Sequence, residues 1–236
     1  MKRKTINISK INYPGWELKF FDNSKNFRAY QLDLMKNYIK GKVAEVGPGN
    51  GMNLSYYLKL PSKIDLYEPT PKLFNKLKKK FSSIKKVSFF NKKFEKSKKK
   101  YDAVLYLDVL EHIKEDKKEI NKALASLKKG GYLIINVPAF SHLYSQFDKD
   151  VGHYKRYEKR DFKNLVSNLK IKNTKYIYYD SIGYLFSLMS KMLITNYKKN
   201  FKNKIKLWDS LIGFSKILDK LIFNFFGKSL VVIIKK

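Results

Sequence analysis

The stretch Glu45-Val46-Gly47-Pro48-Gly49-Asn50-Gly51 decides how this sequence folds. It closes a short apolar run, Lys42 to Val46, which predicts a buried strand stopped by a tight turn, and a helix is expected from about residue 52 to 60. Glycines between a strand and a helix let the backbone approach a ligand, and the helix N-terminus offers free N–H groups. The glycines fall as G-x-G-x-G, with Met52 where the dinucleotide fingerprint has its third glycine, and this counts against NAD.

Glu68 ends the next predicted strand, residues 64–67. A carboxylate at that edge of a sheet can accept two hydrogen bonds from a ribose diol. The alternative is an ordinary surface acid before Pro69. Because Glu68 follows the second strand of a glycine-loop unit, the ribose role is favoured, and loop and acid together indicate a nucleoside-containing ligand.

Strands and helices alternate along the rest of the chain. This alternation predicts an α/β fold, Rossmann-like, with a seven-stranded, mostly parallel sheet and helices on both faces. The further strands are expected at 87–90, 103–107, 132–137, 175–180 and 230–234, and the further helices at 70–81, 114–128 and 159–169.

A single domain is predicted, in four segments: an N-terminal helical cap at 1–40, a core at 41–181, a helical insertion at 182–227 and the last strand at 228–236. The insertion carries an amphipathic helical rhythm. Its apolar side is expected to hold Leu207, Trp208, Leu211, Ile212, Ile217, Leu218, Leu221, Ile222 and Phe225, and its polar side Asp209, Lys216, Asp219 and Lys220. Four roles stay open for it: covering a substrate pocket, pairing with another subunit, lying in a membrane interface, or packing on the sheet.

The chain is strongly basic. Its 236 residues include 51 Lys or Arg against 20 Asp or Glu, for a formal charge of +31. Such a charge fits nucleic acid or an anionic membrane. Only four of these residues are Arg, whereas a surface selected for bidentate phosphate and base contacts would use more of them, so most of the charge is interpreted as a solvated lysine coat.

Cysteine is absent, which excludes disulfides, thiolate metal sites and thiol nucleophiles and favours a cytoplasmic protein, with the inner membrane face as a second location. The N-terminus has no apolar run typical of a secretory signal, and no apolar stretch approaches the ~20 residues that span a bilayer. The Lys-rich segment at 92–100 is expected to be a solvated loop.

Four segments in register resemble the class I S-adenosylmethionine-dependent methyltransferases. Glu45 to Gly51 resembles the family's first motif, and Glu68 matches its ribose-binding acid. Residues 101–113, from Tyr101-Asp102-Ala103-Val104 to Leu110-Glu111-His112, resemble the fourth-strand signature, and residues 127–135 resemble the fifth-strand L-k-P-G-G-x-l pattern. The resemblance implies S-adenosyl-L-methionine as the cofactor.

Two flanking segments resemble a bacterial branch with a G-H-x-R-R-Y signature, associated with glycan, lipid or quinone modification. They are residues 28–31 and the segment from Asp148 through Gly152-His153-Tyr154-Lys155-Arg156-Tyr157, in which Lys155 replaces the first Arg. The family usually has an acid for adenine after the third strand, where this chain offers Asn91 or a backbone contact. The cofactor-binding residues so implied are Arg28, Tyr30, Glu45, Gly47, Gly49, Gly51, Glu68, Asn91 and Asp108.

His112 and His153 are the candidate catalytic bases, since an imidazole titrates near neutral pH. Each has an alternative role: His112 as a helix residue that shapes the pocket, and His153 as a group that orients substrate. The three His are not at ligand spacing along the sequence and Cys is absent, so no metal site is predicted.

The predicted function is methyl transfer from S-adenosylmethionine to a small-molecule, glycan, quinone or lipid-linked acceptor. Two alternatives stay open. One is an RNA-modifying or RNA-binding protein that uses the basic surface, although the fourth-strand motif lacks the N/D-P-P-Y/F clamp of base-amino methyltransferases. The other is a peripheral membrane module, on an anionic surface, with a degenerate cofactor site. The sequence does not indicate the oligomeric state.

Overall fold

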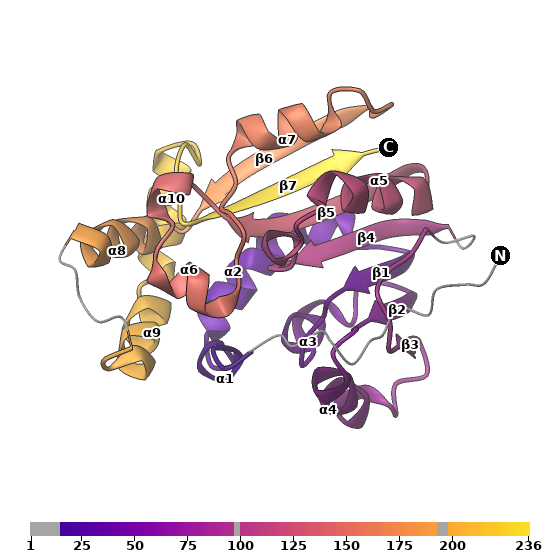
Figure 1. The fold of residues 1–236 in the computed structure, drawn as a ribbon, viewed down its shortest axis with the longest axis horizontal. Coiled ribbons are helices and arrows are strands. Elements are labelled where there is room, and N and C mark those ends of the chain that lie inside the picture. The colour runs from indigo at the N-terminus through magenta and orange to yellow at the C-terminus, as the bar shows by residue number, and fades with distance from the viewer. Residues whose placement is uncertain (1–14, 97–99, 193–197) are drawn as a thin grey trace.

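A seven-stranded sheet runs through the centre of the molecule and carries helices on both faces (Figure 1). The computed structural model describes residues 15–96, 100–192 and 198–236. The strand order is β3-β2-β1-β4-β5-β7-β6, which confirms the predicted α/β fold. The strands are β1 (Lys42–Val46), β2 (Lys63–Tyr67), β3 (Val87–Phe90), β4 (Tyr101–Leu107), β5 (Leu127–Pro138), β6 (Asn173–Tyr179) and β7 (Ser229–Lys235).

Two helical layers enclose the sheet. The α-helices of the described residues are α1 (Leu18–Phe21), α2 (Lys25–Met35), α3 (Met52–Tyr57), α4 (Pro71–Phe81), α5 (Asp116–Ser126), α6 (Gln146–Val151), α7 (Lys159–Val166), α8 (Ser181–Met192), α9 (Phe201–Ser210) and α10 (Ile212–Leu221). Short 3₁₀ turns are η2 (Lys36–Tyr38), η3 (Leu110–His112) and η4 (Ser141–Leu143). One face packs against α2, α3, α4 and α9, and the other against α5 and α7.

Burial on both faces explains why the central strands are continuous apolar runs. Val43 belongs to the apolar cluster on one face and Ala44 to the cluster on the other. Parallel strands covered by helices on both sides need apolar side chains in both directions, whereas a half-exposed strand would alternate. This is why the run before the glycine loop predicted a buried strand correctly.

The last strand, β7, is antiparallel to both of its neighbours, β5 and β6. Tyr179 at the end of β6 pairs with Ser229 at the start of β7, so the segment between them leaves and re-enters the sheet at one edge. The same edge holds the carboxyl ends of β1, β2 and β4, because β6 runs in their direction. Helices α8, α9 and α10 therefore lie beyond that edge, at the left of Figure 1.

Several boundaries differ from those predicted. Helix α3 ends at Tyr57 rather than near residue 60, and β5 begins at Leu127 instead of residue 132. The sequence does not indicate this early start of β5, because Gly130-Gly131 is typical of a turn. In the structure, Leu127 already pairs with Tyr101 of β4, and a register shift separates this pair from the rest of the ladder. In the predicted N-terminal cap, residues 15–40 contain α1, α2 and η2, while residues 1–14 lie outside the described part. The same is true of residues 97–99 in the predicted lysine loop.

The polar side predicted for the helical insertion is wrong for both of its acids. Asp219 is completely buried and Asp209 is 8% exposed, whereas Leu207, Ile217, Leu221 and Phe225 are exposed. The Asp219 carboxylate accepts hydrogen bonds from the backbone N–H groups of Asp180 and Ser181 and from the Tyr30 hydroxyl. Buried N–H groups need acceptors, so these acids serve the interior. Of the predicted apolar side, Trp208 and Ile212 are buried as expected, whereas the four side chains named above turn outward.

Candidate functional site

A cavity of about 650 Å³ opens at the carboxyl edge of the sheet. Three segments that follow β1, β2 and β4 contribute to its wall: residues 47–50, 68–70 and 107–109. Ligands of α/β proteins bind in the crevice beyond the carboxyl ends of the strands, and this cavity has that position. Its volume lies within the range of ~300–1,000 Å³ typical of small-molecule sites.

The three glycines of the loop after β1 have different structural duties. A Cβ atom on Gly47 would lie 2.9 Å from the Val109 side chain, and one on Gly51 would lie 2.4 Å from the Phe81 ring. These two glycines are thus required by packing as well as by their positive φ angles of 66° and 77°. At Gly49 the nearest such contact is 3.8 Å away, so its backbone faces the open cavity.

Glu68 is 3% exposed and lines the cavity. Its Oε2 accepts the Gly49 N–H at 3.0 Å and its Oε1 accepts the Thr70 N–H at 2.8 Å, so the carboxylate ties the glycine loop to the end of β2. Burial raises the pKa of Glu68, and the N–H donors of Thr70 and Gly49 oppose that rise. The Asn91 side chain donates to the Glu68 carbonyl oxygen at 2.8 Å and fixes the backbone at this point.

Arg28 and Asp108 form an ion pair on the cavity wall. Arg28 Nη1 lies 2.9 Å from Asp108 Oδ2, and the Asn136 side-chain amide donates to Asp108 Oδ1 at 2.5 Å. Asp108 has a positive φ of 59°, an uncommon backbone conformation for a residue with a side chain. The Tyr179 hydroxyl in turn donates to Asn136 Oδ1, so a chain of hydrogen bonds holds Asp108 in this orientation.

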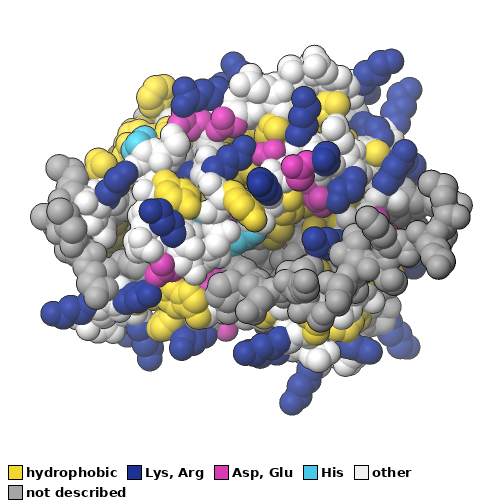
Figure 2. Space-filling view, viewed as in Figure 1, with side chains coloured by type: hydrophobic (Ala, Val, Ile, Leu, Met, Phe, Trp, Pro, Cys, Tyr) yellow, Lys and Arg dark blue, Asp and Glu magenta, His cyan; other side chains and the backbone are white. Residues whose placement is uncertain are grey.

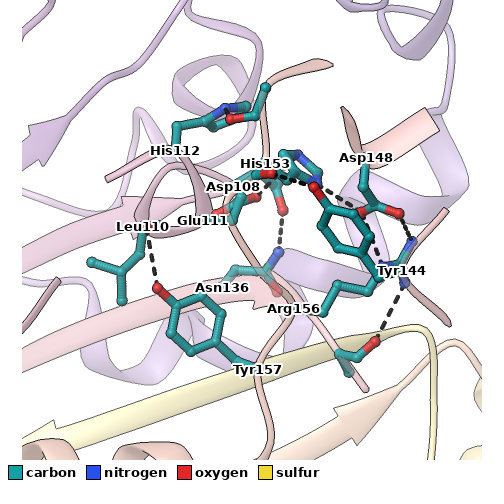
Figure 3. Close-up of polar contacts among 12 residues, drawn as sticks. Asp108, Leu110, Glu111, His112, Asn136, Tyr144, Asp148, His153, Arg156 and Tyr157 are labelled. Carbon is teal, nitrogen blue, oxygen red and sulfur yellow. Dashed lines mark hydrogen bonds and ion pairs between the residues drawn. The ribbon is translucent and has the colours of Figure 1, made fainter. Parts of the chain in front are cut away.

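Glu111, His112 and His153 come together on another part of the wall (Figure 3). The two imidazole rings are 4.7 Å apart between centroids, and His153 Nε2 lies 3.9 Å from Glu111 Oε1. Burial, and then the nearby His153, lowers the pKa of His112 to about 4. Burial raises the pKa of Glu111 well above its ordinary value, and the neighbouring Asp108 charge adds to the rise.

Asp148 fixes the segment that contains His153. Its carboxylate accepts from Arg156 Nε and Nη2, each at 3.0 Å, and from His153 Nδ1 at 2.8 Å. Burial alone would raise the pKa of Asp148, but the His153 hydrogen bond and the Arg156 charge hold it well below its usual range. Lys155, which replaces the first Arg of the G-H-x-R-R-Y signature, instead pairs with Asp116 at 2.7 Å.

The predicted site residues divide into two groups. One group lines the cavity: Arg28, Gly47, Gly49, Glu68, Asp108, His112 and His153. The other group supports it from behind: Tyr30, Glu45, Gly51 and Asn91. Glu45 is 1% exposed and accepts from the Tyr57 hydroxyl at 2.5 Å. The functional roles of all these residues stay predictions.

The cavity wall also contains residues that the sequence did not indicate as site residues, and Glu111 and Trp208 are two of them. Glu111 belongs to the Leu110-Glu111-His112 motif, so the motif that indicates His112 is a usable signal for Glu111 as well. Trp208 lies on α9, far along the chain from the glycine loop and Glu68, and no local pattern assigns it to the cavity. Its Nε1 donates to Asp180 at 2.9 Å, which anchors α9 at the cavity edge.

Comparison with known proteins agrees with this architecture. The family described as "Methyltransferase domain" matches residues 23–176, more than half of the chain. No curated protein sequence matches. Among solved structures, a SAM-dependent methyltransferase from Archaeoglobus fulgidus is similar with a TM-score of 0.61, at 16% identity over 93% of this chain and 97% of that chain.

Two further similar structures contain S-adenosylhomocysteine. The N-methyltransferase NodS from Bradyrhizobium japonicum has a TM-score of 0.54, at 10% identity over 96% of this chain and 93% of that chain. The plantazolicin methyltransferase BamL, in complex with a triazolic desmethyl analog of plantazolicin, has a TM-score of 0.59, at 14% identity over 93% and 89%. At these sequence identities the similarity shows a shared fold and nothing further.

Proposed function

The chain belongs to the methyltransferase-domain family, whose cofactor is S-adenosylmethionine, and we propose that it methylates a small-molecule or lipid-linked acceptor. One observation carries the proposal. A single cavity is lined by Gly49 and Glu68 at one part of its wall and by His112 and His153 at another. A cofactor and an acceptor held in one enclosed space meet the geometric requirement of a direct group transfer.

The residues after β1 and β2 fit the nucleoside part of this cofactor. Glu68 already accepts two backbone N–H groups, and a carboxylate has about four acceptor positions, so two remain for the hydroxyls of a ribose. The bare backbone at Gly49 leaves room for the ligand beside it. Arg28 and Asp108, which lie on the same cavity wall, are assigned to the amino-acid part.

S-adenosylmethionine supplies a methyl carbon on a sulfonium, and its leaving group needs no proton. The chain's residues then have to orient an acceptor and, where that acceptor is a hydroxyl or amine, to remove its proton. His112 is neutral at pH 7 because its pKa is lowered to about 4, so it can accept a hydrogen bond there. His153 is oriented by Asp148, which leaves its Nε2 toward Glu111 and the cavity.

Exposed apolar side chains on the helical insertion support a lipid-linked acceptor. Phe214, Ile217 and Leu221 follow one another at i, i+3 and i+7 along α10 and are 61–69% exposed. Leu185 and Met189 are exposed on α8, which packs against α10. In the sequence, Lys220 stands next to Leu221, and a basic residue near an apolar stripe is expected of a face that docks on an anionic membrane surface. Among the described residues, no helix is long and apolar enough to cross a bilayer.

Titration with S-adenosylhomocysteine tests the cofactor assignment. Glu68→Ala removes the acceptor of the ribose hydroxyls and should weaken binding by about 1.5–3 kcal/mol, or roughly 10- to 150-fold. Glu95→Ala is the matched control, because Glu95 is an exposed acid on the nearby loop that does not line the cavity. Isothermal calorimetry measures both variants. Normal binding by a folded Glu68→Ala variant would exclude the ribose role, and absence of binding by the parent chain at millimolar ligand would exclude the cofactor.

Flotation with anionic vesicles tests the membrane face. Phe214→Asp combined with Leu221→Asp should abolish co-flotation, since two charges would enter the apolar layer. Leu60→Asp serves as the control, because Leu60 is 42% exposed and lies just after α3. If the double variant floats as well as the parent chain, α10 is not the docking face and the lipid-linked acceptor loses its support.

A further inference from the structure

Glu111, His112 and His153 each present a metal-ligating atom, and these three atoms lie within 4.8 Å of one another. Two of the residues end η3, after β4, and His153 follows α6 about forty positions later. The cluster lies on the cavity wall, so a bound ion would be reachable from the site of methyl transfer.

Each imidazole has an oxygen in contact with its Nδ1 atom. His112 Nδ1 lies 3.2 Å from the carbonyl oxygen of Gly152, and His153 Nδ1 lies 2.8 Å from Asp148 Oδ1. A carbonyl oxygen and an ionised carboxylate only accept, so each Nδ1 donates a proton to its oxygen and Nε2 is the nitrogen left to bind an ion. Metal-binding His residues usually have this arrangement, in which an oxygen on the far nitrogen fixes the tautomer and the ring.

Glu111 provides an independent observation. Its side chain is 1% exposed, and its Oε2 atom has no hydrogen-bond partner among the described residues. Leaving a buried carboxylate oxygen unsatisfied is costly, and such atoms in folded proteins call for a partner such as an ion. The Glu111 carboxyl group therefore has an unpartnered oxygen in the cluster that also contains the two imidazoles, and a divalent cation would supply the missing partner.

We propose that Glu111, His112 and His153 bind a divalent transition-metal ion and leave one coordination position open to the cavity. Two imidazoles and one carboxylate form the ligand set of many catalytic zinc sites, and similar sets hold iron and other borderline ions. Two ligands at ~2.1 Å from one ion are at most ~4.2 Å apart, so binding draws the three atoms together. The partly exposed His112 has room for that movement.

The open position would hold an oxygen of the acceptor, and this part of the proposal rests on the proposed methyl transfer. An ion beside an acceptor hydroxyl lowers the pKa of that hydroxyl and orients it. In the metal-bound protein the two Nε2 atoms bind the ion and no longer serve as bases, so the proton of the ion-bound hydroxyl passes to solvent water at the cavity opening. Ion binding itself does not depend on the acceptor or on the cofactor, and it can be measured alone.

The test is titration of the purified, chelator-treated chain with Zn²⁺ by calorimetry and with Co²⁺ by visible absorption. The parent chain should bind one ion and give a Co²⁺ spectrum in the visible range. Glu111→Gln and His153→Asn should each lower the affinity at least about tenfold and change that spectrum, since each removes a ligand. His142→Asn is the matched control, because His142 is an exposed imidazole that contacts Tyr184.

Each outcome decides the proposal. Equal affinity in the parent chain and in folded Glu111→Gln and His153→Asn variants means adventitious surface binding and overturns it, as does the absence of stoichiometric binding. Folding is checked by S-adenosylhomocysteine titration of the same variants, because Glu68 and Gly49 are not altered. If the chain binds the metal ion but not the cofactor, the ion site is supported and the methyltransferase assignment is wrong. If the chain binds the cofactor but not the metal ion, only the ion site is wrong.

Discussion

Glu45 and Glu68 lie at the ends of adjacent strands and have different environments. Glu68 lines the cavity and accepts two backbone N–H groups. Glu45 is buried behind the glycine loop, where its partner is the Tyr57 hydroxyl. Burial raises the pKa of Glu45 from 4.5 to about 7, although the Tyr57 hydrogen bond opposes the change. Position at the end of a strand therefore does not by itself determine which acid meets a ligand.

Glu45→Gln should change how stability depends on pH. The folded chain holds the Glu45 proton more tightly than the unfolded chain does. The contribution of this group to the free energy of unfolding is therefore complete below pH 4.5 and is lost as pH rises through about 7. The shift corresponds to about 3 kcal/mol. Denaturant unfolding at pH 5 and pH 8 should show a smaller loss of stability in Glu45→Gln than in the parent chain. An identical pH dependence in the two proteins would contradict the raised pKa.

At the scale of elements, buried acids connect the helical insertion to the rest of the fold. Asp219 on α10 accepts from the start of α8 and from Tyr30 on α2. Asp209 on α9 accepts from the backbone N–H groups of Asn26 and Phe27. Asp180, between β6 and α8, has its pKa raised to about 6 by burial, which Lys228 and the backbone N–H of Gly183 oppose. The insertion is thus held by polar anchors, and several of its apolar side chains are exposed.

Asp219→Ala should destabilise the chain by roughly 2–4 kcal/mol, because it leaves buried donors without an acceptor. Asp33→Ala is the control. Asp33 also faces two partners, Lys36 and Lys216, but all three are well exposed, and surface ion pairs contribute about 0–1 kcal/mol. Thermal unfolding should show a drop of ~4–16 °C for Asp219→Ala. Equal unfolding temperatures for the two variants would mean that Asp219 does not anchor the layer.

At the scale of the whole molecule, the cavity joins segments from both halves of the chain. Residues 17–28 and 47–70 contribute to its wall together with Trp208 and Lys228. Basic side chains are scattered over the face seen in Figure 2 and do not gather in one patch there. This distribution agrees with a solvated lysine coat on that face.

S-adenosylhomocysteine should stabilise the whole molecule, because it binds the folded cavity and not the unfolded chain. At a hundred times its Kd the expected gain is about 2.7 kcal/mol. For a chain of this length that corresponds to a rise in Tm of ~5–11 °C. Glu68→Ala should show a smaller rise at the same ligand concentration. No rise in the parent chain at saturating ligand would contradict binding in this cavity.

RNA binding tests whether the basic residues form a solvated lysine coat or a dedicated RNA-binding surface. A lysine coat predicts weak affinity for single-stranded RNA that falls steeply between 50 and 200 mM salt, as counterion release requires. Saturating S-adenosylhomocysteine should leave this affinity unchanged, since the contacts are spread over the surface. Tight binding at physiological salt would favour the RNA-modifying alternative, and filter binding across a salt series would reveal it.

The sequence by itself determined the sheet, the glycine loop and the acid after β2. These depend on local patterns, an apolar run and a turn of fixed spacing, whose structural preferences act over a few residues. Only the tertiary structure determines contacts between residues that lie far apart in the sequence. Asp219 is buried and Leu221 is exposed, although the helical periodicity of the insertion predicts the reverse. The reason is that backbone N–H groups from a distant part of the same chain need the Asp219 carboxylate as their acceptor. The tertiary structure also brought His153 beside Glu111 and His112, because only the packing of η3 against the segment after α6 sets the distance between them.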